Sequence, residues 1–354
     1  NHDILTDKMV CLGFSESTLQ WFKSYLYSRQ FKVSLNDKLS EPGKITCGVP
    51  QGSILGPLLF LLYINDIPQA VECDILLYAD DTCLLFQHKD INVIADQLNR
   101  DFSKLCEWFV DNKLSVHFGE DKTKSILFGS KIKIKKAEPL SIKYNNIKIS
   151  QYKKVTYLGC ILDDTLSGES MALNSINKIN NRLKFLYRQG NFLNKSLRRL
   201  LCNAMIQPFF DYACSTWYPN LNQNLKNRLQ ATQNKCIKFC LEIGNRTSVK
   251  AKDFEELNWL NVDDRFNQTV ASNIFKFFKN CGPGYLDEIY FPADQECIIP
   301  KRRTNMGMKS LSYIGPAFWN KLPSFLKHEK TLNNFKHKIK EYFLSNIKKK
   351  NSSQ

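Results

Sequence analysis

The sequence lacks the features of membrane proteins and of secreted proteins. Its longest apolar run, residues 54–64, contains Gly56 and Pro57 and is shorter than the roughly 20 residues that a membrane-spanning helix needs. No signal peptide opens the chain, and no internal repeat is present. Because the sequence starts at Asn1 without an initiator methionine, we expect it to begin inside a longer protein.

Disulfide and zinc patterns are also missing, although the chain has 12 cysteines. Cys236 and Cys240 are four residues apart, but no further Cys or His pair follows at the spacing of a zinc site. With Cys202 and Cys214 they are predicted to line helix faces as small hydrophobic residues. Scattered cysteines without a disulfide framework indicate a reducing compartment.

Charge is unevenly distributed along a composition typical of a globular protein. The 354 residues are 43% hydrophobic and 12% aromatic, enough for two or three domains, and carry a formal charge of +16. Residues 1–120 have a net charge of −6, and the remainder has +22. This asymmetry suits a cation-binding centre beside a phosphate-binding surface. A basic protein with no nucleic-acid role is the alternative.

The stretch 75–86 holds two adjacent carboxylates between apolar runs. The runs have the length of buried strands, and Tyr78-Ala79-Asp80-Asp81 between them predicts a β-hairpin with its acids at the turn. Neighbouring aspartates repel each other, so an exposed turn or a bound cation is what makes them tolerable. A solvated turn without function is the plainer interpretation.

Prolines and glycines shape the loop at residues 48–57. Backbone N–H groups in such a glycine-bounded segment can closely approach a phosphate or a base. We expect a helix over 58–64 with Pro57 at its first position. A purely structural loop is equally compatible with this stretch.

Other segments give the coarse secondary structure. Strands are predicted at 31–35, 125–128 and 155–162, the last one bent or bulged at Gly159, and a basic loop at 131–136. Apolar residues at helical spacing predict helices at 19–26 (capped by Ser15 or Ser17), 94–109, 176–186, 197–205 (ended by Pro208), 221–241 and 332–347. A linker or turn is expected at 282–284. The basic helices beyond residue 170 suit a surface that binds a nucleic-acid backbone. Alternatively, their cations only form solvated helix faces.

Taken together, these motifs resemble the reverse transcriptase of non-LTR (LINE-type) retrotransposons, nearest to the Jockey-like group. The matching segments are the Gly-Val-Pro-Gln-Gly-Ser loop at 48–57, the Tyr-Ala-Asp-Asp box at 78–81, the Trp-Phe…Asn-Lys-Leu-Ser…Lys-Thr-Lys segment at 108–128, the Tyr-Leu-Gly hairpin at 155–162, and the Arg-Arg-Thr…Trp-Asn-Lys-Leu-Pro tail at 302–323. A group II intron maturase also uses Tyr-Ala-Asp-Asp, but the Trp-Asn tail argues against it.

The resemblance implies an α+β fold of the right-hand polymerase type. Residues 1–165 would be part of a palm, an antiparallel sheet with packed helices. Residues 166–245 would form a helical thumb, and 246–354 a basic, partly helical C-terminal region. The fingers would be absent.

The resemblance also implies an RNA-directed DNA polymerase that uses two Mg²⁺ ions, an RNA template, a DNA primer and deoxynucleoside triphosphates. Asp80 and Asp81 would bind metal, and Lys122 would assist at the pyrophosphate. Pro50, Gln51, Gly52 and Tyr78 would bind nucleotide and template. Tyr157, Leu158 and Gly159 would position the primer end, as a primer-grip hairpin.

One departure limits the implied activity. The family's other metal-bridging aspartate lies just before a stretch that resembles residues 1–5, so it would fall upstream of this sequence, and Asp3 is not its equivalent. Two aspartates alone hold magnesium poorly. We therefore expect this fragment to be inactive by itself. A degenerate or co-opted copy that binds RNA or DNA without polymerising is the alternative function.

Overall fold

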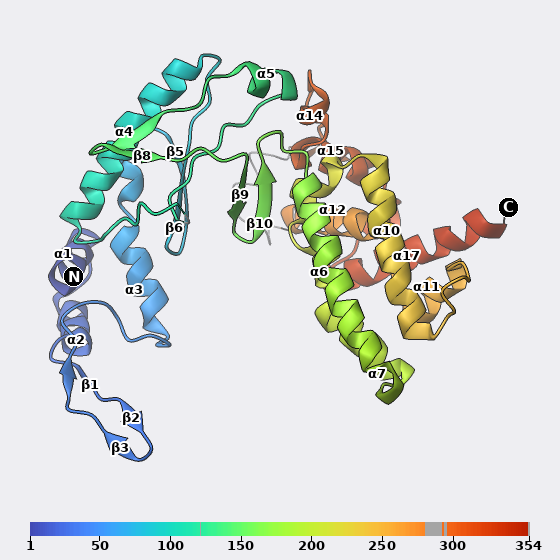
Figure 1. Ribbon diagram of the computed structural model, residues 1–354, viewed down its shortest axis with the longest axis horizontal. Helices are drawn as coiled ribbons and strands as arrows, with labels where there is room; N and C mark the ends of the chain where they lie inside the picture. Colours follow the sequence, from blue (N-terminus) through green and yellow to red (C-terminus); the bar gives the residue numbers. More distant parts are fainter. Residues whose placement is uncertain (121, 280–291, 294–295, 353–354) are drawn as a thin grey trace. The chain divides into compact units, whose positions relative to one another are not determined.

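The computed structural model describes residues 1–120, 122–279, 292–293 and 296–352 (Figure 1). The chain divides into two compact units. The N-terminal unit contains residues 1–127 and 135–152, and the C-terminal unit contains residues 128–134 and 153–354. The linker predicted at 282–284 lies outside the described residues. No described helix combines the length and apolar character needed to cross a bilayer.

Helices form most of the core of the N-terminal unit. They are α1 (His2–Cys11), α2 (Glu16–Leu26), α3 (Leu55–Ile64), the short 3₁₀ helix η1 (Ile67–Ala70) and α4 (Ile91–Asp111). Ser15 caps α2 as predicted, because its side chain accepts the Thr18 N–H. Leu5, Met9, Leu26 and Leu59 are buried together where α1, α2 and α3 meet. This core supports the hairpin described below.

Four antiparallel two-stranded sheets belong to the same unit. The pairs are β1 (Gln30–Phe31) with β4 (Gly43–Lys44), β2 (Ser34–Leu35) with β3 (Lys38–Leu39), β5 (Asp74–Tyr78) with β6 (Asp81–Leu85), and β7 (Ile142–Tyr144) with β8 (Ile147–Ile149). The strand predicted at 31–35 is therefore broken into two short ones. Helices with small antiparallel sheets make the fold α+β.

Helix α4 connects two hydrophobic clusters of this unit. Ile94, Leu98 and Phe102 pack on buried residues of β7 and β8, whereas Leu105 and Phe109 contribute to the core of α1–α3. This confirms the predicted stripe. Asn112 ends the helix.

Other local predictions were wrong as well. Helix α3 begins at Leu55, so Pro57 is its third residue; the first-turn N–H groups have no helical partner in any case, which is why proline is tolerated there. Residues 125–128 form only an isolated bridge between Ser125 and Gln151. Residues 131–136 form a short helix, α5 (Lys131–Lys136), instead of a loop.

The C-terminal unit is almost entirely helical after one hairpin. The hairpin is β9 (Lys154–Tyr157) with β10 (Cys160–Asp163). Helices follow: α6 (Glu169–Arg188), η2 (Gly190–Phe192), α7 (Lys195–Met205), α8 (Pro208–Asp211), α9 (Cys214–Trp217), η3 (Tyr218–Asn220), α10 (Gln223–Leu241), α11 (Ala251–Leu257), α12 (Val262–Phe278), α14 (Asn305–Met308), α15 (Leu311–Asn320), α16 (Ser324–Lys327) and α17 (Leu332–Ser352). A short pair, β11 (Pro292–Ala293) with β12 (Glu296–Cys297), lies among them.

Two cores fill the C-terminal unit. The first gathers Cys160 of β10, α6–α11 and the start of α12. It includes the four cysteines of the prediction, which confirms that they act as small hydrophobic residues: Cys202, Cys214, Cys236 and Cys240. The second gathers the rest of α12 with β12, α15, α16 and α17, around the buried Trp319 and Phe335.

The predicted helices at 176–186, 197–205, 221–241 and 332–347 are all present. Pro208 does not end α7, because α7 already ends at Met205 and Pro208 is the first residue of α8.

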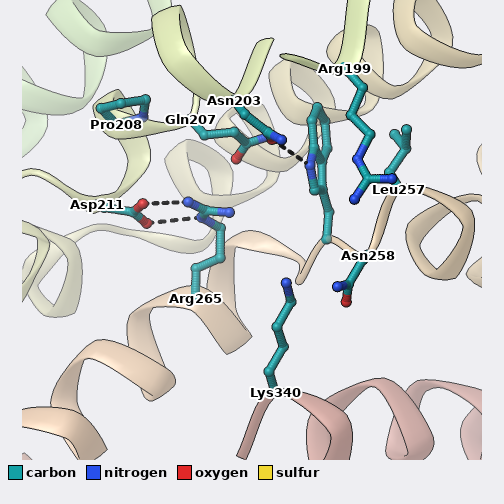
Figure 2. Close-up of a pocket in the computed structure, with 10 residues that line it drawn as sticks. Arg199, Asn203, Gln207, Pro208, Asp211, Leu257, Asn258, Arg265 and Lys340 are labelled. Carbon is teal, nitrogen blue, oxygen red and sulfur yellow. Dashed lines mark hydrogen bonds and ion pairs between the residues drawn. The ribbon is translucent and has the colours of Figure 1, made fainter. Parts of the chain in front are cut away.

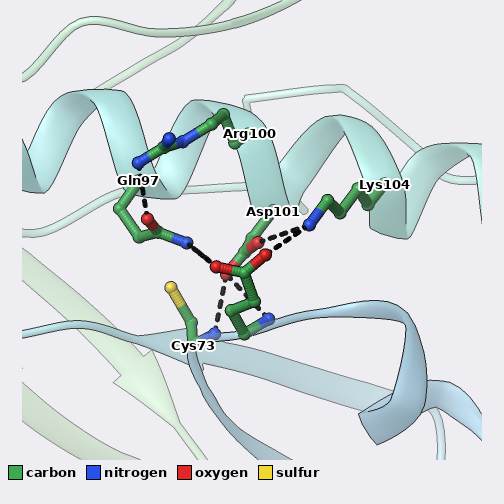
Figure 3. A network of polar contacts seen from close by, with 6 residues as sticks. Cys73, Gln97, Arg100, Asp101 and Lys104 are labelled. Carbon is green, nitrogen blue, oxygen red and sulfur yellow. Dashed lines mark hydrogen bonds and ion pairs between the residues drawn. The ribbon is translucent and has the colours of Figure 1, made fainter.

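A buried carboxylate holds the start of the β5–β6 hairpin against α4 (Figure 3). Asp101 is fully buried, and it accepts hydrogen bonds from the backbone N–H of Cys73 (2.7 Å), the backbone N–H of Glu72 (3.1 Å) and Gln97 Nε2 (3.2 Å). Lys104 bridges to Glu72 at 2.8 Å. Burial disfavours the charged form, but the hydrogen bonds, led by Cys73, hold the pKa of Asp101 below its ordinary 3.8. The Cys73 thiol stays protonated, because burial, followed by the neighbouring Asp101, raises its pKa to about 12.

Replacing Asp101 by asparagine should lower the free energy of unfolding by about 2 kcal/mol at neutral pH, because a charged acceptor of three donors is lost. The lowered native pKa means that this contribution is complete above the unfolded value near 3.8 and disappears as the pH falls through the native value. Urea unfolding of wild type and D101N at neutral and acidic pH measures it. D96N, which changes an exposed acid on the same helix, is the control. A difference that persists in acid would contradict the explanation.

Candidate functional site

The acidic pair lies at the tip of the β5–β6 hairpin. Tyr78 and Asp81 are the last paired residues, and Ala79-Asp80 form a two-residue turn between them. Ala79 has φ +50°, a left-handed backbone that costs a side-chain-bearing residue about 1 kcal/mol. The hairpin at 75–86 is thus confirmed.

The two faces of the hairpin have different surroundings. Ile75, Leu77 and Leu84 are half-buried and pack on the core of the N-terminal unit. On the other face, Tyr78 is 63% exposed and Leu76 is 47% exposed. The strands are therefore buried on one face only, not on both. The cross-strand register puts Asp81 on the exposed face with Tyr78.

Both carboxylates are available to a ligand. Asp80 and Asp81 are exposed, and within the described residues neither side chain makes a hydrogen bond or ion pair. Carboxylate oxygens are the donors that hard divalent cations prefer. However, no group of three or more His, Cys, Asp or Glu residues that could hold a metal occurs among the residues described. The pair thus fits part of a metal site.

The glycine-proline loop is fixed to the same core as the hairpin. Gly48 and Gly52 both have φ +79°, which favours glycine at these two positions. The Gly48 carbonyl accepts from His2 Nε2 at 2.7 Å, which links the loop to α1. Val49 and Leu55 pack on the core that carries Ile75 and Leu77. The intervening Gln51 and Gly52 are exposed, and Pro50 is half-buried. One core therefore positions both the loop and the acidic hairpin.

Lys122 is exposed in a tight turn, where its backbone N–H donates to the Gly119 carbonyl at 2.9 Å. No hydrogen bond or ion pair joins its ammonium group to Asp80 or Asp81 in the residues that the structure describes. Its role at the pyrophosphate stays a prediction.

The Trp108-Asn112 segment has a structural role in the N-terminal unit. The Lys8 ammonium lies 4.5 Å from the centre of the Trp108 ring and 2.6 Å from Asp66. Asn112 donates to the Trp108 carbonyl at 2.8 Å, and its own carbonyl accepts from the Tyr63 hydroxyl at 2.5 Å. These contacts tie α1, α3 and the end of α4 together, so this motif maintains the core behind the hairpin.

The segment with Tyr157, Leu158 and Gly159 forms the turn of the β9–β10 hairpin, so residues 155–162 are two strands and not one bent strand. Leu158 has φ +46° and Gly159 has φ +74°, a tight two-residue turn. The Tyr212 hydroxyl donates to the Leu158 carbonyl. The indole of Trp217 in turn donates to the Tyr212 carbonyl at 3.0 Å. Tyr212, which directly follows α8 and which the sequence motifs did not identify, therefore supports this turn.

Known proteins match the chain over the same motifs. Residues 1–162 match the family model of the reverse transcriptase (RNA-dependent DNA polymerase). This part of the chain is similar to reverse transcriptases. The described hairpins β5–β6 and β9–β10 both fall within the matched part.

The curated proteins to which the chain is similar include proteins of insect mobile elements. The chain is 27% identical over 232 residues to a probable RNA-directed DNA polymerase from transposon X-element of Drosophila melanogaster, covering 61% of the chain and 24% of that protein. It is 27% identical over 248 residues to the corresponding protein of transposon BS of Drosophila melanogaster, covering 67% and 27%. It is 30% identical over 161 residues to the polymerase from mobile element jockey of Drosophila funebris, covering 43% and 17%.

These relatives confirm the resemblance to Jockey-like, non-LTR reverse transcriptases. The chain spans about a quarter of the length of the X-element and BS proteins. The matched family generally uses divalent metal ions and acts on a nucleic-acid template with nucleotide substrates.

Replacing Tyr212 by phenylalanine should loosen the β9–β10 turn, because the Leu158 carbonyl loses its donor while the ring remains. We expect the free energy of unfolding to fall by about 1 kcal/mol. Amide hydrogen exchange should accelerate most in residues 156–160. Tyr313, whose hydroxyl makes no hydrogen bond within the described residues, provides the control Y313F. Unchanged exchange at the turn in Y212F would refute the supporting role.

Proposed function

We propose that the chain is part of an RNA-directed DNA polymerase of a non-LTR retrotransposon. In this proposal residues 1–165 belong to the palm, 166–245 form the thumb, and 246–354 are a basic C-terminal region. The observation that carries it is the exposed pair Asp80 and Asp81 at a hairpin tip, held on the same core as the loop at 48–57. The motif order and the family match support the same assignment.

Asp80 and Asp81 would hold Mg²⁺ through their carboxylates. The donor chemistry fits, because Mg²⁺ prefers oxygen ligands and commonly takes only one or two protein carboxylates along with substrate phosphates. When bound, magnesium would activate the primer 3′-hydroxyl and stabilise the leaving pyrophosphate. At the exposed tip, neither side chain has a competing hydrogen bond or ion pair to another described residue.

Other residues of the chain would orient the substrates. Pro50, Gln51 and Gly52 would shape the pocket for nucleotide and template, and Tyr78, on the same face as Asp81, would lie beside them. Lys122 would steady the pyrophosphate through its charge. The Tyr157-Leu158-Gly159 turn would hold the primer end, with Tyr212 as its support.

We further propose that polymerisation requires a carboxylate from polymerase sequence outside these 354 residues. Two adjacent aspartates supply only part of a two-metal site, and the described residues bring no third metal-binding side chain to them. The chain alone should therefore not extend a primer.

Replacing Asp80 by asparagine in the complete polymerase should reduce primer extension on poly(rA) with dTTP and Mg²⁺ by at least about a thousandfold, because a metal ligand is lost. D81N should also impair extension. The control is D74N, which changes an exposed acid at the base of the same hairpin and should retain activity. Full extension by D80N would exclude Asp80 as a ligand, and extension by the 354-residue chain would refute the requirement for an outside carboxylate.

The competing function is binding of RNA or DNA without catalysis. The basic helices of the C-terminal unit are the candidate surface for it. Several of their cations have partners within the protein: Arg182 lies over Phe209, Lys226 over Tyr218, and Lys238 donates to the Asn245 carbonyl at 2.6 Å. Exposed cations are left on α6 and α10: Lys184, Arg188, Arg228 and Lys235. On these two helices, the four cations have no partner among the described residues and are available to an RNA backbone.

If the C-terminal unit binds RNA, its affinity should fall steeply with salt, because each phosphate contact releases counterions. Neutralising Lys184, Arg188, Arg228 and Lys235 together should reduce the slope of log affinity against log salt by roughly three to four. Filter binding between low and physiological salt measures it. Neutralising the internally paired Arg182, Lys226 and Lys238 should leave the slope nearly unchanged. Salt-insensitive binding would exclude this interface.

A further inference from the structure

A separate pocket of about 330 Å³ lies within the C-terminal unit, outside the part that matches the reverse transcriptase model. Figure 2 shows that its lining comes from several helices. Helix α7 supplies Arg199 and Asn203, α12 supplies Arg265, and α17 supplies Lys340. Residues far apart in the sequence thus converge on one small cavity.

Positive charge dominates this pocket. Three cations, Arg199, Arg265 and Lys340, face a single acid, Asp211. Arg265 is already bound to Asp211 through two hydrogen bonds, one of them 2.9 Å from Nε to Oδ1. Within the described residues, Arg199 and Lys340 have no ion pair or hydrogen bond. Two cationic groups are therefore left uncompensated.

The pKa of Lys340 reports the same imbalance. Burial lowers it, and the nearby Arg265 and Arg199 lower it further. A like-charged cluster of this kind destabilises the empty protein, and a bound anion would relieve the repulsion.

An unsatisfied amide lies in the same lining. Gln207 is 4% exposed, and neither its side-chain nitrogen nor its side-chain oxygen has a hydrogen-bond partner in the part of the chain that the structure describes. Its backbone is fully engaged, since its N–H donates to the Cys202 carbonyl and its carbonyl accepts from Phe210. A buried amide without partners costs about 1–3 kcal/mol. A ligand with several hydrogen-bonding oxygens would remove this cost.

We propose that this pocket binds a phosphate group. Arg199 and Lys340 supply the two uncompensated positive charges, and Gln207 supplies a buried N–H donor. A phosphate matches these features because it carries up to two negative charges and presents several acceptor oxygens. The volume is near the lower limit for small-molecule sites, which suits a phosphate with little attached to it. The group arrives either as one phosphodiester of an RNA strand or as free phosphate. The proposal does not depend on the catalytic role of Asp80 and Asp81.

Calorimetric titration of the full chain with inorganic phosphate, at constant ionic strength, tests the site. Wild type should bind phosphate, and both R199Q and K340Q should bind it about tenfold more weakly or worse, because each removes a charged partner. K195Q is the matched control: Lys195 is an exposed residue at the start of the same helix as Arg199 and does not line the pocket. Equal phosphate binding by all four proteins, or no binding by wild type, would overturn the proposal.

Q207L provides a second readout that a purely structural role would not produce. In phosphate-free buffer its melting temperature should be equal to or above that of wild type, because the unsatisfied amide is gone. Added phosphate should raise the melting temperature of wild type by several degrees more than that of Q207L. An equal rise in both proteins would exclude Gln207 from the site.

Competition with a 12-nucleotide oligo(U) RNA distinguishes the two sources. If the RNA displaces phosphate, and R199Q and K340Q weaken RNA binding more than K195Q does, the ligand is an RNA phosphodiester. If phosphate binding depends on Arg199 and Lys340 but RNA neither competes nor responds to these variants, the ligand is free phosphate. If the RNA displaces phosphate but binds wild type, R199Q and K340Q equally well, a site for RNA in this pocket would be contradicted.

Discussion

The contact on which the N-terminal unit depends is the packing of one face of the β5–β6 hairpin onto a helical core. Ile75 and Leu77 bury one side of the strand, and Asp101 fixes its start through hydrogen bonds to the backbone. With both the base and one face held, the turn has little freedom. The charged tip can then remain in water on a fixed base, which suits the proposed metal-binding role of the carboxylate pair. Preorganisation here comes from apolar burial and a buried acid remote from the pair itself.

Local signals in the sequence were enough to predict this hairpin and most helices. Alternation of side chains and a turn of small and acidic residues identify residues 75–86, and the helical stripe identifies α4. The same reasoning failed at residues 131–136, where a lysine-rich segment contains isoleucines at spacing two and yet forms a helix. Short segments carry too little periodicity to distinguish helix from loop or strand.

Features that depend on distant residues were not visible in the sequence. Tyr212 lies 54 residues from the Leu158 carbonyl that it supports, and Asp101 lies 28 residues from Cys73. The phosphate pocket joins α7 to α17, and nothing about Gln207 in the sequence indicates a buried amide without partners. Motif recognition identified the exposed residues at Tyr78, Asp80 and Gln51, whose local patterns are distinctive. The residues that hold them are ordinary in type and acquire their roles through packing.

Helix α12 has a consequence for how the C-terminal unit assembles. Its first half, with Val262, Phe266 and Val270, completes the core of α6–α11, while its second half, with Ile274 and Phe275, completes the core of α15–α17. Helix α12 thus contributes to both cores, so unfolding of either core removes packing residues from the other core. An expressed fragment that stopped near residue 245 would expose the apolar seam of α10 and would be prone to aggregate. Residues 166–245, the proposed thumb, and residues 246–354 should therefore melt in a single cooperative transition, and they are best handled as one folding unit.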